Sequence, residues 1–350
     1  MIYIHIPFCV RKCLYCDFYS ITDKGKSAPY IKALKDEIAS FKGMHTSTVY
    51  IGGGTPTALG EGLVEVIDAV NESFVFDGDV EFTVEANPGT VNEELLKKLR
   101  GKGVNRISLG AQSFNDNELA ALGRIHTASD IFHSCDAIKS AGFENFSIDL
   151  MLATPYQSME SLSYSLDCVE KISPPHVSAY SLIVEEGTPF YDMQLNLPDE
   201  DTERQMYYYT TQRLHKNGLY RYEISNFAKK GYESRHNCGY WKDCEYIGIG
   251  AGAHSYFGGA RFCNAPDIER YILGEGRKED YTQISERERK LELFMLGLRM
   301  TEGVLYNGEF KDKVNPLIEK GLLKLQGGRL MLTDRGTDCA NLVFMEFLDD

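Results

Sequence analysis

The chain has 350 residues, of which 43% are hydrophobic and 25% charged, a composition typical of a globular protein with a sizeable core. Its formal net charge of −14 argues against nucleic acid as the main partner, because phosphate binding depends on clustered Lys and Arg. Apolar runs stay far below the roughly 18 residues of a membrane-spanning helix, and the first residues carry no basic region or cleavage site. The sequence therefore predicts a cytoplasmic protein without a signal peptide or membrane span.

The first half of the chain alternates short β-rich runs with helical patterns. Strands are predicted at 2–6, 48–51, 79–85, 106–109, 145–150 and 177–182. Helices are predicted at 29–41, 60–73, 92–100, 129–140, 158–171 and 201–217. Because parallel strands need a helical crossover, these six units predict an α/β fold, a partial (β/α)6 barrel over 1–220. Functional side chains are expected at the carboxyl ends of its strands.

Two further regions follow the predicted barrel. Residues 221–284 are rich in Gly and aromatic side chains, show no clear periodicity and are expected to pack on the barrel near its mouth. Residues 285–350 contain two helical runs and two apolar strands that meet at Gly327 and Gly328, which resembles a small α+β winged-helix domain. Residues 286–350 hold 10 Lys and Arg against 12 Asp and Glu, so we do not expect this domain to bind DNA.

Three of the nine cysteines are closely spaced in one short loop, as Cys9-x3-Cys13-x2-Cys16. A cubane 4Fe-4S cluster held by three thiolates keeps one iron without a protein ligand. The amino and carboxylate groups of S-adenosylmethionine could bind that iron. Zinc is the competing interpretation, since His5 could complete a Cys3His site, and three core cysteines are the plainest alternative. Four other cysteines are expected in the core, namely Cys135, Cys168, Cys263 and Cys339.

The CxxxCxxC motif after a first strand resembles the signature of the radical S-adenosylmethionine enzymes. The sequence YIHIPFCVRKCLYCDF is similar to their coproporphyrinogen oxidase branch, and four more motifs follow in that branch's order: GGGTPT (52–57), EANP (85–88), SLGAQSF (108–114) and DLMLATPYQ (149–157). The resemblance implies a radical SAM barrel and a 4Fe-4S cluster on Cys9, Cys13 and Cys16. It also implies that S-adenosylmethionine contacts Tyr3, Gly53, Gly54, Thr55, Glu85, Gln112, Arg124 and Asp149.

These residue types suit that cofactor chemically. Glycines 52 to 54 would let backbone amides meet the methionyl portion, with the Thr55 hydroxyl as a further donor. Glu85 and Asp149 could accept hydrogen bonds from ribose hydroxyls or the amino group, and Arg124 could pair with a carboxylate. Each residue alone is more typical of a surface or structural polar residue. Their expected convergence on one barrel edge favours a binding site.

Two features separate the chain from the oxidases of this family. The oxidases have a further cysteine two residues after the third, where this chain has Phe18. In addition, RHNCGYW resembles the HNxxYW pattern of haem chaperones in the same family. Neutral imidazole is a common axial ligand of haem iron and aromatic rings can pack on a porphyrin, so the resemblance implies a haem site of His236, Asn237, Tyr240 and Trp241. A structural His beside an aromatic cluster is the alternative.

Other polar residues in this region have weaker assignments. Cys238 and Cys244 flank the HNxxYW pattern and could offer a thiolate, although they are more typical of small buried residues. His254, in GAGAHSY, is expected only to line the cofactor pocket.

Two functional hypotheses follow. The first is a haem chaperone that binds the cluster, S-adenosylmethionine and haem, and transfers haem to apo-haemoproteins such as respiratory enzymes. The second is an enzyme of porphyrin biosynthesis, an oxygen-independent coproporphyrinogen III oxidase that decarboxylates propionate side chains. Radical chemistry on another substrate is a third hypothesis. The sequence assigns no catalytic residue, and it leaves open whether S-adenosylmethionine is cleaved and whether the chain forms a homodimer.

Overall fold

A nine-stranded sheet forms the centre of the structure, a computed structural model that describes residues 1–348. The strand order is β7-β8-β6-β5-β4-β3-β2-β1-β9. Strands β1 to β6 and β9 pair in parallel, whereas β8 pairs antiparallel with β6 and β7 with β8. The strands are β1 (Ile2–Ile6), β2 (His45–Gly53), β3 (Val75–Ala86), β4 (Arg106–Gln112), β5 (Asn145–Leu152), β6 (His176–Ser181), β7 (Tyr220–Arg221), β8 (Asn226–Ala228) and β9 (Ile247–Ile249).

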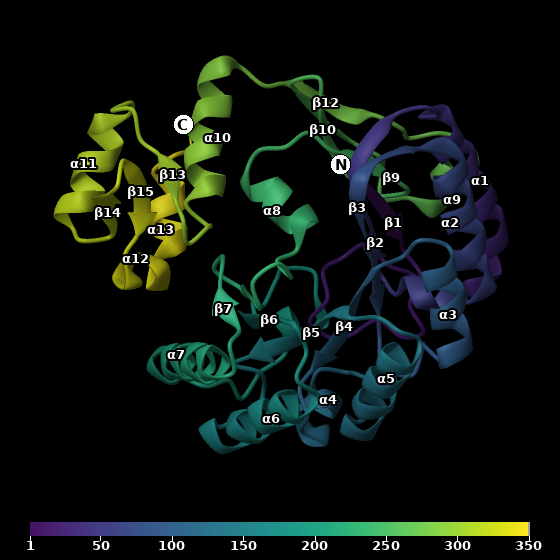
Figure 1. Cartoon of the computed structure of the whole chain (residues 1–350), viewed down its shortest axis with the longest axis horizontal. Helices are drawn as coiled ribbons and strands as arrows, with labels where there is room; N and C mark the ends of the chain where they lie inside the picture. The colour runs from purple at the N-terminus through teal and green to yellow at the C-terminus, as the bar shows by residue number, and fades with distance from the viewer. Residues whose placement is uncertain (349–350) are drawn as a thin grey trace.

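Helices cover the outer face of this curved sheet, as Figure 1 shows. The crossover helices are α1 (Ser27–Ser40), α2 (Glu61–Ser73), α3 (Glu93–Gly101), α5 (Ala128–Ser140), α6 (Met159–Ile172) and α7 (Glu200–Lys216). The short helix α4 (Asp116–Ala121) and three 3₁₀ turns, η1 (Lys24–Lys26), η2 (Pro56–Leu59) and η3 (Pro189–Asp192), lie in the loops. The predicted partial (β/α)6 barrel is confirmed. One continuous apolar core fills the space between sheet and helices.

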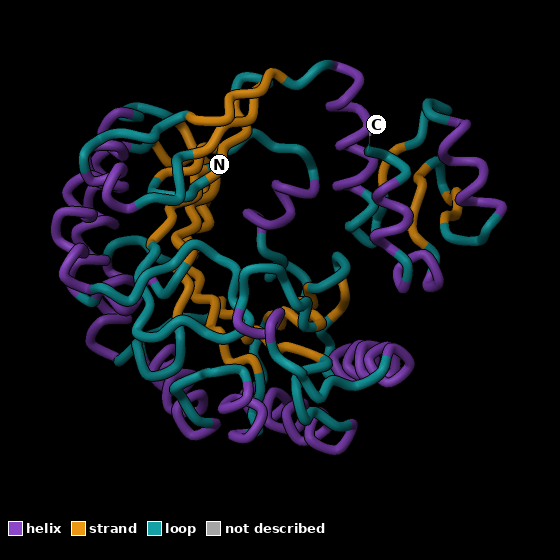
Figure 2. The backbone as a smooth tube through the Cα atoms, turned by 180° about the vertical axis from the view of Figure 1, so that it is seen from behind, coloured by secondary structure: helices purple, strands orange, loops and turns teal. Residues whose placement is uncertain are grey.

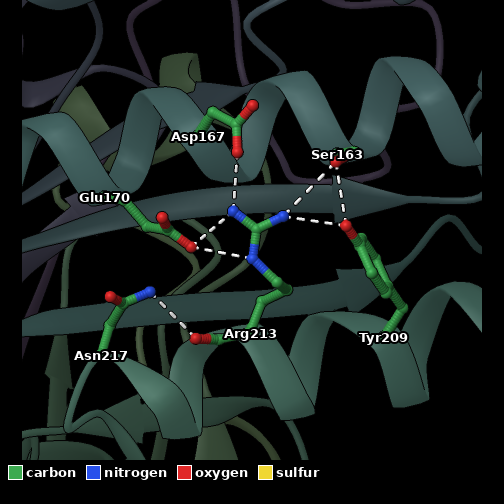
Figure 3. Close-up of polar contacts among 6 residues, drawn as sticks. All are labelled: Ser163, Asp167, Glu170, Tyr209, Arg213 and Asn217. Carbon is green, nitrogen blue, oxygen red and sulfur yellow. Dashed lines mark hydrogen bonds and ion pairs between the residues drawn. The ribbon is translucent and has the colours of Figure 1, made fainter.

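The arginine Arg213 ties helix α7 to helix α6 (Figure 3). Its Nε and Nη2 donate to Glu170 Oε1 at 2.8 and 2.5 Å, and Nη2 also donates to Asp167 Oδ1 at 2.6 Å. Its Nη1 donates to the Tyr209 hydroxyl at 2.8 Å, and that hydroxyl is hydrogen-bonded to Ser163 Oγ at 2.9 Å. These contacts fix how the last two crossover helices lie against each other.

Residues 221–284 contain more regular structure than their sequence pattern predicts. Strands β8 and β9 extend the barrel sheet at its two sides, so the sheet continues beyond residue 220. Helix α8 (Arg235–Trp241) lies on the concave side of the sheet (Figures 1 and 2). Three strands form a second sheet: β10 (His254–Phe257), β11 (Ala260–Cys263) and β12 (Glu279–Gln283). One short helix, α9 (Ile268–Ile272), lies between β11 and β12 in the chain.

The C-terminal region packs around its own apolar core, which includes Leu291, Phe294, Val314 and Leu330. Its sheet has the order β13-β15-β14, and both pairings are antiparallel. The elements are α10 (Glu286–Gly297), β13 (Val304–Leu305), α11 (Lys311–Glu319), β14 (Leu323–Gln326), β15 (Arg329–Leu332), α12 (Asp334–Asp338) and α13 (Ala340–Met345). The winged-helix-like α+β architecture agrees with the prediction. Positions 349 and 350 of the predicted domain lie outside the described residues.

Between residues 1 and 348, none of the helices combines the length and apolar character that crossing a bilayer requires.

Candidate cluster and cofactor site

The three closely spaced cysteines lie in the loop that follows β1, and all of them are free thiols. A backbone hydrogen bond from Cys9 N to Ile21 O at 2.9 Å joins the two ends of this loop, and one from Leu14 N to Leu122 O at 3.1 Å holds its middle. Two side chains donate to its sulfurs: Thr55 Oγ1 to Cys9 Sγ at 3.7 Å and Arg124 Nη1 to Cys13 Sγ at 3.5 Å. Burial raises the pKa of Cys16 to about 11 and also raises the pKa of Cys9.

The surroundings of this loop fit a cluster better than a single zinc ion. Both nitrogens of the candidate ligand His5 are engaged, Nδ1 with the Tyr3 hydroxyl at 3.0 Å and Nε2 with the Tyr19 carbonyl at 2.9 Å. Within the described chain, no three His, Cys, Asp or Glu side chains converge as one metal ion would require. A cubane cluster takes each thiolate on a different iron, so it does not need that convergence.

Glycines at the end of β2 bring that strand against the cysteine loop. A Cβ on Gly54 would lie 3.0 Å from Cys9 Sγ and 2.9 Å from the Phe8 carbonyl oxygen. The Gly54 and Thr55 amides donate to the Ile6 and Phe8 carbonyls, both at 2.8 Å. These two amides are thus used within the protein rather than free for a cofactor. The requirement for glycine at position 54 comes from this close approach.

Two carboxylates of the predicted site face the lumen of the barrel. Glu85 accepts from the Tyr50 hydroxyl at 2.7 Å and from Gly53 N at 3.2 Å, and Asp149 accepts from Ser147 Oγ at 2.9 Å. Removal from bulk water raises the pKa of both groups, that of Glu85 to about 7. Both residues are partly exposed, which means that the lumen is reachable from outside. They can accept hydrogen bonds from a polar ligand there.

Arg124 connects the carboxyl ends of the strands to the cysteines. Its Nη2 donates to Asn87 Oδ1 and to the Gly110 carbonyl, both at 2.5 Å. Asn87 Nδ2 in turn donates to Thr55 Oγ1 at 2.7 Å. The chain Thr55–Asn87–Arg124–Cys13 therefore forms one polar network beside the loop. Sequence reasoning did not assign Asn87, although it is the third residue of the EANP motif.

The remaining predicted cofactor residues lie at the same edge or deeper. Gln112, at the end of β4, has a φ of +68° and accepts from the Tyr180 hydroxyl at 3.1 Å. Tyr3 lies lower in the lumen, where its ring stacks on Tyr50 with centroids 6.3 Å apart. The structure thus brings Thr55 and Arg124 to the cysteines, and places Glu85 and Asp149 in the lumen.

The predicted haem residues belong to α8, whose first amides donate to the Ser234 hydroxyl and to the Glu81 carboxylate. Glu81 Oε1 accepts from His236 N at 2.9 Å. His236 is 1% exposed, and its ring is hydrogen-bonded through Nδ1 to Thr48 Oγ1 at 2.8 Å and through Nε2 to the Tyr240 hydroxyl at 3.0 Å. Burial lowers its pKa to about 3, so the ring is neutral. Neither nitrogen is free to bind iron in this arrangement.

The other residues of the HNxxYW pattern point to different neighbours. Trp241 packs against Arg299 of the C-terminal domain. The guanidinium carbon lies 4.3 Å from the centroid of the Trp241 ring. The backbone amide of Asn237 donates to Ser234 Oγ at 3.4 Å and helps cap the helix.

Phe18, where the oxidases have a fourth cysteine, is 62% exposed. His254 is exposed at the start of β10.

Comparisons with known proteins agree with this geometry. Residues 3–169 match the family model of the Radical SAM superfamily, and residues 284–338 match the HemN C-terminal domain. The structure of E. coli coproporphyrinogen III oxidase (HemN), a radical SAM enzyme, superimposes with a TM-score of 0.86 over 99% of this chain and 89% of that one. At 23% identity this likeness shows the fold alone.

Full-length relatives are more similar in sequence. Heme chaperone HemW of Lactococcus lactis is 40% identical, covering 99% of this chain and 97% of its own. HemW of Bacillus subtilis is 38% identical over 99% of both chains, and HemW of E. coli is 35% identical over 92% and 89%. The fold and the cysteine motif define a radical SAM protein with a HemN-type C-terminal domain. Within that class, the chain belongs to the HemW family.

Proposed function

We propose that this protein is a cytoplasmic haem chaperone. It binds a 4Fe-4S cluster on Cys9, Cys13 and Cys16, binds S-adenosylmethionine in the adjoining lumen, and carries haem to apo-haemoproteins such as respiratory enzymes. The single observation that carries the proposal is the full-length identity of 32–40% with relatives named heme chaperone HemW. The nine free thiols support a reducing compartment.

The cluster loop supports the cofactor part of this proposal. When bound, the cluster would supply an open iron and a one-electron reductant. Arg124 and Thr55 already donate to Cys13 and Cys9, and would stabilise the thiolates. Glu85 and Asp149 would accept hydrogen bonds from the ribose or amino group of S-adenosylmethionine. Thr55 and Arg124 would thus position the cluster, and Glu85 and Asp149 would orient the cofactor.

Anaerobic reconstitution tests the cluster ligands. The protein should bind about four iron and four sulfide, with the broad absorption of a cubane cluster, and Cys9→Ser should lose most of that signal. Cys168→Ser is the matched control, because Cys168 is a buried thiol on α6. Equal iron loss in both variants, or full loading of Cys9→Ser, would remove Cys9 from the ligand set.

Haem transfer tests the function itself. The purified protein should bind haem in a one-to-one complex and pass it to an apo-haemoprotein, measured by the change in the Soret band. The fold shared with HemN makes coproporphyrinogen III oxidation the second candidate. The same reconstituted sample is therefore assayed anaerobically with coproporphyrinogen III and S-adenosylmethionine. Protoporphyrinogen IX formation at enzymatic rates would replace the chaperone proposal with the oxidase.

A further inference from the structure

A buried arginine at the base of the barrel lumen has no assigned role. Arg106, the first residue of β4, is 1% exposed. Its Cα is paired in register with Thr83 on β3 and with Asn145 on β5. Within the described chain, its Nε and Nη1 lack hydrogen-bond partners, as do Thr83 Oγ1 and Asn145 Oδ1. Two of the three guanidinium nitrogens therefore have no hydrogen-bond acceptor among the described residues at the base of the lumen.

The side chain of Arg106 points toward the two carboxylates of the cofactor site. Alternate residues of a strand point to the same face, and Ser108 Oγ donates to Asp149 Oδ2 at 3.1 Å, so Arg106 also faces the lumen. Two residues span roughly 7 Å along a strand. Arg106 thus lies two residues before Ser108, toward the amino end of β4. On β3, Glu85 lies two residues after Thr83, which pairs with Arg106. The guanidinium is placed beneath both carboxylates.

A charge in this position matters because the carboxylates have only uncharged hydrogen-bond donors. The contacts of Glu85 are the Tyr50 hydroxyl and Gly53 N, and those of Asp149 are serine hydroxyls. A buried guanidinium with two unsatisfied nitrogens is costly, and two partly buried carboxylates are costly as well. Opposite charges across the lumen offset part of both costs.

We propose that Arg106 is a positioning residue that acts through charge and keeps Glu85 and Asp149 ionised to accept S-adenosylmethionine. The inference rests on the proposed cofactor site and deepens it. The guanidinium lowers the pKa of both carboxyls, against the larger effect of burial that raises them. Other titratable side chains surround the same lumen. They are Tyr3 on β1, Tyr50 on β2, His176 and Tyr180 on β6, Tyr222 after β7, and His236 and Tyr240 on α8.

The first test measures S-adenosylmethionine affinity of the reconstituted protein between pH 6 and 9. Arg106→Met removes the charge and keeps an apolar stem, and it should raise the pH midpoint of binding by about one unit. Affinity should then fall about fivefold at pH 7, about tenfold at pH 6 and little at pH 9, because a shift of one pKa unit changes the ionised fraction tenfold only below the midpoint. Arg106→Lys should stay near the wild-type midpoint. A loss of equal size at every pH would mean a structural role and overturn the proposal.

The second test needs neither cluster nor cofactor. Infrared difference titration of the full unloaded chain follows the protonated carboxyl band, and Glu85→Gln assigns the Glu85 component. The midpoint of the Glu85 titration should rise in Arg106→Met. It should rise less in Arg106→Lys, because the lysine keeps a positive charge on a shorter side chain. The Lys variant replaces the Met variant in this test if the Met variant does not fold. An unchanged midpoint overturns the inference. Failure of the wild-type protein to bind S-adenosylmethionine would instead remove the proposed cofactor site.

Discussion

At the scale of single residues, the ring of His236 makes the clearest distinction between a structural and a ligand role. Both nitrogens are hydrogen-bonded, to Thr48 and Tyr240, and the ring packs on Tyr50 with centroids 5.1 Å apart. Iron binding through Nε2 therefore requires the Tyr240 hydroxyl to leave. The haem assignment to His236 remains a prediction, and the structure supplies a sharper way to test it.

We expect Tyr240→Phe not to weaken haem binding and His236→Ala to weaken it. The first variant frees Nε2 while keeping the aromatic ring, so haem should bind at least as tightly as to the wild type. The second removes the ligand, and haem binding should weaken at least tenfold. Spectrophotometric haem titration of both variants measures this. His236→Ala should also cost about 1–3 kcal/mol of stability through its lost buried hydrogen bonds. Unchanged haem spectra and affinity in His236→Ala would exclude it as the ligand.

Glu85 predicts a measurable dependence of stability on pH. Its pKa is raised in the folded chain from 4.5 to about 7, so the folded state holds more protons than the unfolded state between these values. Raising the pH through that window therefore costs stability. Glu85→Gln should be relatively more stable at pH 8 than at pH 5, by about 1–3 kcal/mol. Urea unfolding of the unloaded chain at both pH values measures the difference, and a constant offset between variant and wild type would contradict it.

At the scale of elements, the sequence was sufficient where periodicity is strong. The six predicted strands and their crossover helices are present because alternation of apolar runs and amphipathic stretches directly reflects burial. Segment 221–284 was not predictable in this way, because β8 and β9 are three residues long and depend on their neighbours β6 and β1 for pairing. Arg106 and Asn87 were missed for a related reason. Their roles depend on inter-strand register and on contacts between distant loops, which no local pattern encodes.

The cysteine loop was predictable from sequence spacing, whereas the contacts of the α8 motif were not. Tight spacing alone predicted that Cys9, Cys13 and Cys16 share one loop. The spacing of His236 and Trp241 could not reveal that the helix directs them to different partners, Thr48 and Arg299. Five positions along a helix place side chains on different faces, so proximity in sequence does not ensure a shared pocket.

The contact between α6 and α7 depends on Arg213, which binds two carboxylates and a tyrosine hydroxyl (Figure 3). Arg213→Met keeps the stem and removes these bonds, and should lower the free energy of unfolding by about 1–2 kcal/mol. Asp167 is half exposed, so the effect should shrink in high salt. Chemical denaturation at low and high salt measures both effects. The exposed pair Lys35–Glu65 provides the control, because Lys35→Met should cost less than 1 kcal/mol.

At the scale of the whole molecule, the two apolar cores are joined by polar contacts and by Ile224, which packs against the C-terminal core. Asp243, directly after α8, accepts from Arg289 Nε of α10 at 3.0 Å, and Thr301 N donates to the Tyr222 carbonyl at 3.0 Å. These polar contacts thus connect α8, which borders the lumen, to the C-terminal domain. We keep the proposed boundary at residue 285, since the second core begins beyond it.

Breaking this contact should loosen the C-terminal domain before the barrel unfolds. Arg289→Gln leaves the Asp243 carboxylate, whose side chain is only 2% exposed, without its cation. We expect faster limited proteolysis near residues 284–289 with little change in far-UV circular dichroism. The matched control is Lys290→Gln, on the same helix as Arg289, which disrupts an exposed pair between Lys290 and Glu309 outside that helix. Equal proteolysis rates in the two variants would show that the Asp243 pair does not hold the domains together.

The position of the sole tryptophan gives the protein a built-in optical reporter. The Trp241 indole, at the end of α8, lies against the Arg299 cation, which also lies over the Phe344 ring of the C-terminal domain. A movement that separates these parts would take the cation away from the ring and change its fluorescence emission. Haem absorbs at the emission wavelengths of indole, so its arrival near α8 should quench the same signal. Stopped-flow fluorescence of the unlabelled wild-type chain can therefore time domain movement and cargo loading in one experiment.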